Sequence, residues 1–145
     1  MQVGRDRRAD AGYTPGMPAM EKLKNLLAEA NLTDKAQKVG DSMYRLRWGS
    51  ATVIAGTAGD AIVVIAPLFD ALPAQGADAL CKRLLEINGT LGGTAAFAIS
   101  SEGAVVLQVG RGLKGLDADE FSMMLGTVGK FADDYDDKLR AEFYK

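Results

Sequence analysis

Residues 77–111 constrain the fold of this chain more than any other stretch. An apolar stripe at helical spacing runs through the first part of it: Leu80, Cys81, Leu84, Leu85 and Ile87. This spacing predicts one amphipathic helix with its apolar side turned toward a core. The pair Asn88-Gly89 predicts the end of that helix, because a residue in the left-handed conformation commonly closes one.

Two short apolar runs follow this helix, at residues 94–99 and 104–109. The four residues between them, Ser100-Ser101-Glu102-Gly103, are typical of a tight turn. Together these features predict a β-hairpin directly after the helix. The stretch holds no catalytic motif, so it defines architecture and says little about chemistry.

The rest of the chain supplies one helix and three strands before this stretch and one helix after it. We expect them at residues 18–30, at 42–48, 51–55 and 61–66, and from Asp117 to the end. Asp117, with Glu120 three residues later, is typical of a capping box at the start of the last helix. A run of meandering strands without repeated βαβ units favours an α+β fold, with helices packed on one face of an antiparallel sheet. Residues 1–17 show no periodicity and are predicted to form a flexible N-terminal tail, which leaves 18–145 as one domain.

Composition excludes several classes of function. The chain has no histidine, which removes His-based catalytic triads and the common zinc sites. A net charge of −2 does not favour nucleic acid as a partner, and no apolar run approaches the roughly 20 residues of a membrane helix. A single cysteine is typical of a reducing compartment. We therefore expect no cofactor, no metal, no nucleic acid and no membrane.

Two sets of residues keep a small enzyme open as the alternative function. Cys81 stands beside Lys82 and Arg83, and such charges lower the pKa of a reactive thiol. Its place on the apolar stripe favours packing instead. An acidic pair, Asp133 and Asp137, is the other catalytic candidate, but it lies in a strongly periodic helix whose polar side faces water.

The strand at residues 42–48 gives the best indication of a binding surface. It alternates, which places Met43, Arg45 and Arg47 on the face that is wetted by solvent. A flexible thioether beside two guanidinium groups suits the apolar and acidic side chains of an extended protein segment. We predict that these three residues bind such a partner.

Two runs are more apolar than one small domain requires. The strand at 61–66 is apolar on both faces, and the second hairpin strand at 104–109 is nearly so. Apolar surface of this kind usually marks an interface, and two-fold self-association is the commonest way to cover it. We therefore predict a homodimer, with an interface that includes Ile62, Val64, Val105 and Leu107.

The order of elements, read with short segments of sequence, resembles a known family. The segments are Leu84-Leu85-Glu86-Ile87-Asn88, Phe97-Ala98-Ile99, Glu102-Gly103, Val105-Val106-Leu107 and Gly115-Leu116-Asp117-Ala118-Asp119-Glu120-Phe121. Over residues 20–145 the chain is similar to the type III secretion chaperone-like fold that YbjN-like bacterial proteins share.

The resemblance implies a small, cytoplasmic, dimeric and non-enzymatic protein of bacterial type. Secretion chaperones of this fold hold an extended effector segment on their helix-and-sheet surface, whereas YbjN-like members are described as sensory-transduction or stress-response regulators. The expected function is accordingly that of a chaperone-like or regulatory protein-binding module.

Overall fold

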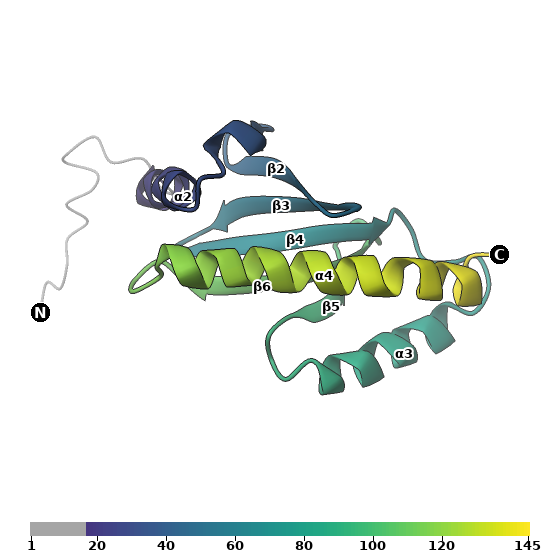
Figure 1. The fold of residues 1–145 in the computed structure, drawn as a ribbon. Helices are drawn as coiled ribbons and strands as arrows, with labels where there is room; N and C mark the ends of the chain where they lie inside the picture. Colours follow the sequence, from purple (N-terminus) through teal and green to yellow (C-terminus); the bar gives the residue numbers. More distant parts are fainter. Residues whose placement is uncertain (1–16) are drawn as a thin grey trace, which may run out of the picture.

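The computed structural model describes residues 17–145. Of the tail predicted for residues 1–17, residues 1–16 lie outside the described range. In chain order the elements are α2 (Met17–Glu29), the 3-10 helix η1 (Thr33–Lys35), β1 (Gln37–Lys38), β2 (Met43–Trp48), β3 (Ala51–Ala58), β4 (Ala61–Phe69), α3 (Ala77–Thr90), β5 (Ala96–Ile99), β6 (Val105–Gly112) and α4 (Ala118–Phe143). Figure 1 shows α4 running along the sheet, with α2 at one end and α3 beside β5. The predicted α+β class and antiparallel sheet are confirmed.

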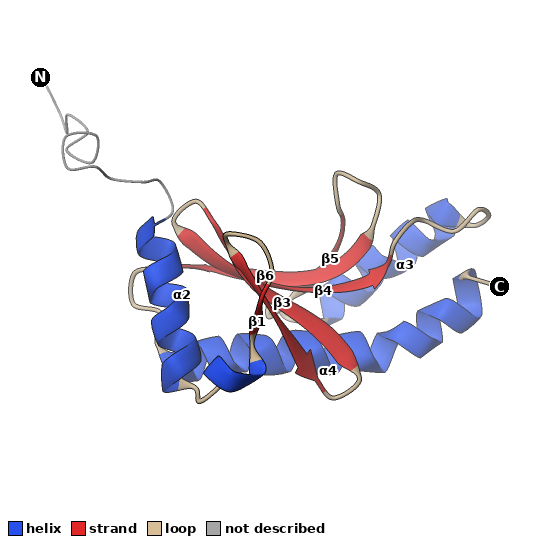
Figure 2. Cartoon of the chain, turned by 90° about the horizontal axis from the view of Figure 1, so that it is seen from above, coloured by secondary structure: helices blue, strands red, loops and turns tan. Residues whose placement is uncertain are grey.

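The strands form one antiparallel sheet in the order β1-β2-β3-β4-β6-β5 (Figure 2). The sequence predicted every strand except the two-residue β1. It placed the end of β4 at Pro67, but that strand runs on to Phe69, and its register with β6 shifts between these two residues. Such an irregularity is where a strand tolerates a residue without an N–H group.

The sheet has two unlike faces. The helices pack on the face that carries the buried side chains, which we call the helix face: Leu46, Val53, Ala55, Ile62, Val64, Ala66, Phe97, Val105, Leu107 and Val109. The dimer interface predicted at Ile62, Val64, Val105 and Leu107 is therefore wrong. All four side chains are 0% exposed within a single chain, so they belong to its own core and present no surface to a second copy.

Helix α4 begins at the cap that the sequence predicted. The side chain of Asp117 accepts a hydrogen bond from the backbone N–H of Glu120, at 2.8 Å. From there Phe121, Leu125 and Val128 are fully buried against the sheet. Gly129 follows on the same side of the helix, and its bare backbone lies directly against the indole of Trp48.

Helix α3 departs from the prediction at its end and on its surface. It continues through Gly89 to Thr90, and the left-handed residues come later, at Gly92 and Gly93. Only Leu80, Leu84 and Ile87 of the predicted stripe are buried. Leu85 is 71% exposed, and Cys81 is half-buried, so neither belongs to the core.

Asn88 fastens α3 to the outer edge of β5. Its side-chain nitrogen donates to the carbonyl oxygen of Phe97 at 3.1 Å, and its side-chain oxygen accepts from the N–H of Phe97 at 2.7 Å. Phe97 pairs with Leu107 of β6 on its other side. The amide of Asn88 thus takes the place of one residue of a further strand.

Replacing Asn88 with alanine is expected to lower the free energy of unfolding by about 1–3 kcal/mol, because two backbone groups of Phe97 lose their partners. Urea denaturation followed by circular dichroism measures this change. Asn25→Ala, on the exposed side of α2, is the control and should change stability by less than about 0.5 kcal/mol. Equal midpoints for the two variants would contradict the bonding of Asn88 to β5.

Candidate partner-binding surface

The second face of the sheet is the candidate functional surface, and we call it the open face. Its side chains alternate with those of the helix face, and no helix within residues 17–145 covers it. The residues that shape it are Met43, Arg45, Arg47, Ile54, Val63, Ile65, Val106 and Gln108. Among these, Ile54, Val63 and Ile65 stay partly exposed although they are apolar and central.

Strand register orders the open face into rows. In one row Arg45 stands opposite Ile54, and Ile54 stands opposite Ile65. Gln108 of β6 continues that row beyond Ile65, and Ala96 of β5 ends it. Positive charge therefore lies along β2, apolar surface lies on β3 and β4, and a neutral amide lies on β6. Along the described parts of β3, β4, β5 and β6, no side chain on this face is charged.

The three residues predicted to bind a partner all lie on the open face. Arg45 and Arg47 are exposed, and no carboxylate within residues 17–145 forms an ion pair with either. Met43 is 40% exposed and leans over Gly56 of β3, where an added Cβ would lie 3.1 Å from its Cγ. The alternation of the sequence thus placed these three side chains correctly.

A hollow on the opposite side of β2 adjoins this surface and was not predicted. It measures about 310 Å³ and lies between α2, η1 and β2. Its lining is mostly apolar: Lys24, Leu27, Ala28, Thr33, Ala36 and Tyr44. Sequence reasoning missed it because Tyr44 and Leu27 come together only when α2 packs beside β2.

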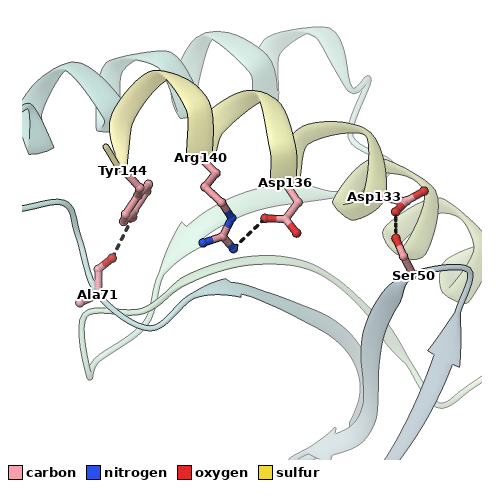
Figure 3. A network of polar contacts seen from close by, with 6 residues as sticks. All are labelled: Ser50, Ala71, Asp133, Asp136, Arg140 and Tyr144. Carbon is pink, nitrogen blue, oxygen red and sulfur yellow. Dashed lines mark hydrogen bonds and ion pairs between the residues drawn. The ribbon is translucent and has the colours of Figure 1, made fainter.

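Several acidic residues of α4 contact neighbouring groups, as Figure 3 shows for two of them, Asp133 and Asp136. The Ser50 hydroxyl donates to Asp133, and Arg140 pairs with Asp136 at 3.1 Å. Asp134 pairs with Lys130 at 3.4 Å. Within the described residues, no group of three or more acidic or cysteine side chains is placed to hold a metal ion.

The end of α4 is tied to the loop after β4. The Tyr144 hydroxyl donates to the carbonyl oxygen of Ala71 at 2.8 Å (Figure 3), and its ring stacks on Phe69 at 4.1 Å. Burial raises the pKa of the Tyr144 hydroxyl above its usual value, and the nearby Arg140 opposes that rise. These contacts anchor the end of the helix to that loop.

Neither set of residues behind the enzyme alternative gathers into a catalytic arrangement. Cys81 lies on α3, and the carboxylates of Asp133 and Asp137 lie on α4. Asp133 accepts a hydrogen bond from Ser50, a contact that joins the β2–β3 turn to α4.

No helix within the described residues has the length and apolar character needed to cross a membrane.

Comparison with known proteins places the fold. The model of the family described as the Tir chaperone protein (CesT) family matches residues 21–128. Among curated proteins, none matches the sequence. Several solved structures resemble the chain; they belong to complexes of two proteins, and each shares little sequence with it.

The ExsC–ExsE complex contains a chain with a TM-score of 0.61 and 16% identity, and the match covers 81% of this chain and 93% of that one. The heterodimeric ExoU–SpcU complex from the type III secretion system of Pseudomonas aeruginosa gives a TM-score of 0.60 at 15% identity, covering 78% and 93%. The HopA1–SchA chaperone–effector complex gives 0.62 at 13%, covering 83% and 97%.

Proposed function

This chain belongs to the Tir chaperone protein (CesT) family, and on that premise we propose that it is a chaperone that binds a segment of another protein on the open face of its sheet. The observation that carries the proposal is the open face itself. Apolar side chains remain partly exposed at the centre of the sheet, and they are flanked on β2 by two arginines that form no ion pair with the described residues 17–145.

An exposed apolar surface beside charges without ion-pair partners is typical of a protein interface whose partner is absent. Partner carboxylates would give Arg45 and Arg47 the bidentate hydrogen bonds that guanidinium groups make best. Three neighbours in fold belong to two-protein complexes, ExsC–ExsE, ExoU–SpcU and HopA1–SchA, which supports a protein as the ligand of this chain also.

The hollow between α2 and β2 gives the same partner a second point of attachment. It lies across the β1–β2 edge from Arg45 and Arg47, and a segment that rounds this edge reaches both. A cytoplasmic location and a regulatory role of the YbjN-like kind remain predictions from the resemblance.

The double substitution Arg45→Glu with Arg47→Glu is the test of this function. A benzophenone cross-linker placed at Val63 first captures the native partner in cells, and that partner is then purified. Its affinity for the double variant is expected to fall at least roughly 100-fold, because two attractive charges become two repulsive ones.

The matched control is Lys114→Glu with Lys138→Glu, which changes net charge equally at exposed positions away from the open face. This control should bind the partner with the affinity of the unmodified chain. Thermal unfolding of both variants should match it too, since surface changes cost little. Undiminished binding by the Arg45 and Arg47 variant would show that the open face is not the binding site.

We further propose that the chain is a homodimer whose interface is the outer side of α3. Small or apolar residues recur there every four positions: Ala77, Cys81, Leu85 and Gly89. Leu85 is 71% exposed, and Ile99 on the neighbouring β5 is 39% exposed. Two such stripes fit each other across a two-fold axis, where small residues let helices approach closely.

The open face is a poor place for this dimer. A second copy laid on it would bring its own Arg45 and Arg47 toward the same cationic strand, and the face has no carboxylate on the other strands to offset them. Charge therefore supports a different protein as the occupant of the open face and α3 as the surface for the second copy.

A further inference from the structure

The open face and the edges of the sheet suit partner segments of different backbone conformation. A strand added at an edge bonds to the free N–H and C=O groups of that edge. On a sheet face those groups are already bonded to neighbouring strands. An extended segment lying there would bury its own backbone groups without partners, at a cost, whereas a helix satisfies its backbone internally.

Neither edge of the described sheet offers a long run for strand addition. At one edge, the two-residue β1 covers only Tyr44 and Arg45 of β2, so the free run there is the three residues 46–48. At the other, both outward groups of Phe97 in β5 are bonded to the side chain of Asn88, and beyond β5 the free run is the four residues 109–112 of β6. The extended partner expected from the sequence therefore has little edge to join, and the broad uncovered surface is the open face.

The pattern of the open face suits one kind of helix. Ile54, Val63 and Ile65 form an apolar centre on β3 and β4. Arg45 and Arg47 lie two residues apart along β2, about 6.6 Å for a strand. Carboxylates four residues apart on a helix are separated by a rise of about 6 Å, so two of them match the two guanidinium groups.

We propose that the open face binds an amphipathic helix of the partner, with an apolar stripe on Ile54, Val63 and Ile65 and with Asp or Glu at positions i and i+4 on the flank that faces Arg45 and Arg47. This inference rests on the proposed function, and it adds the conformation and the charge pattern of the bound segment.

Three synthetic peptides of about 18 residues test the inference, a length at which a helix forms readily on binding. The first carries a leucine stripe and a flank of glutamates, the second carries lysines in place of those glutamates, and the third carries the glutamates and a central proline. Fluorescence anisotropy measures their affinity for the full-length chain, and amide chemical shifts locate the bound peptide.

The glutamate peptide is expected to bind at least roughly tenfold more tightly than either of the others, with shifts at Ile54, Val63 and Ile65. In the Arg45→Glu, Arg47→Glu variant the preference should reverse toward the lysine peptide. That reversal would distinguish binding through complementary charge from nonspecific hydrophobic binding of an apolar peptide.

Equal binding of the proline peptide would overturn the helical conformation, and so would shifts confined to Tyr44 and the hollow or to β1. Failure of all three peptides to bind would overturn the inference as well. None of these results touches the proposed function, which fails only if the native partner keeps its affinity for the Arg45 and Arg47 variant.

Discussion

Replacing Gly129 with valine is expected to destabilise the protein by about 3 kcal/mol or more, which is the upper range for overpacking a tight contact. A Cβ at this position would lie 2.6 Å from Cγ and Cδ1 of Trp48 and 2.8 Å from its Cβ. Because Cβ and Cγ of Trp48 are fixed close to its backbone, rotation of the indole alone does not relieve this clash. A lower urea midpoint at unchanged slope is the measured result.

Met123→Val is the control, because Met123 also lies in α4 but its side chain is 70% exposed. It should change stability by less than about 0.5 kcal/mol, as surface substitutions usually do. Trp48→Ala should cost less in the Gly129→Val background than in the unmodified chain, since the clash is gone. Additive costs would show that the two residues do not meet.

Replacing Leu85 with aspartate is expected to convert the proposed homodimer to a monomer. Burying one leucine contributes about 1.5–3 kcal/mol, and two-fold symmetry counts that loss twice. The dissociation constant should therefore rise by about 100-fold to 10,000-fold, before the cost of burying two carboxylates is added. Light scattering at micromolar concentration measures the mass directly.

Met123→Asp is the control for this experiment. Met123 is 70% exposed on α4, nearly the same fraction as Leu85, but it lies away from the stripe on α3. It should leave the dimer intact. A dimeric Leu85→Asp variant would refute the interface on α3, and a monomeric unmodified chain would refute the homodimer altogether.

The local pattern of the sequence determined most of the elements and one of the two surfaces. Helical spacing and the Asp117 cap located α4, because caps and amphipathic stripes act within one or two turns. Strict alternation placed Arg45 and Arg47 on one side of β2, since successive residues of a strand point to opposite faces. These signals need no knowledge of what packs nearby.

Alternation failed where both faces of a strand are apolar. In β4 the sequence does not distinguish Ile62 and Val64, which are fully buried, from Val63 and Ile65, which are partly exposed. The difference arises because the helices cover only one face of the sheet. Which face the helices cover depends on contacts between residues far apart in the chain. For this reason the residues predicted for the dimer interface lie in the core instead.

Only the tertiary structure decided how the ends of the sheet are finished. The β5–β6 hairpin folds back so that β6 pairs with β4 and leaves β5 at the edge. The sequence predicted that Asn88 ends a helix, because asparagine is common at helix ends. In the structure its side-chain amide is hydrogen-bonded to the backbone of Phe97, nine residues further along the chain. Propensity reports how a residue behaves toward its immediate neighbours, whereas the partner of a side chain is fixed by the path of the whole chain.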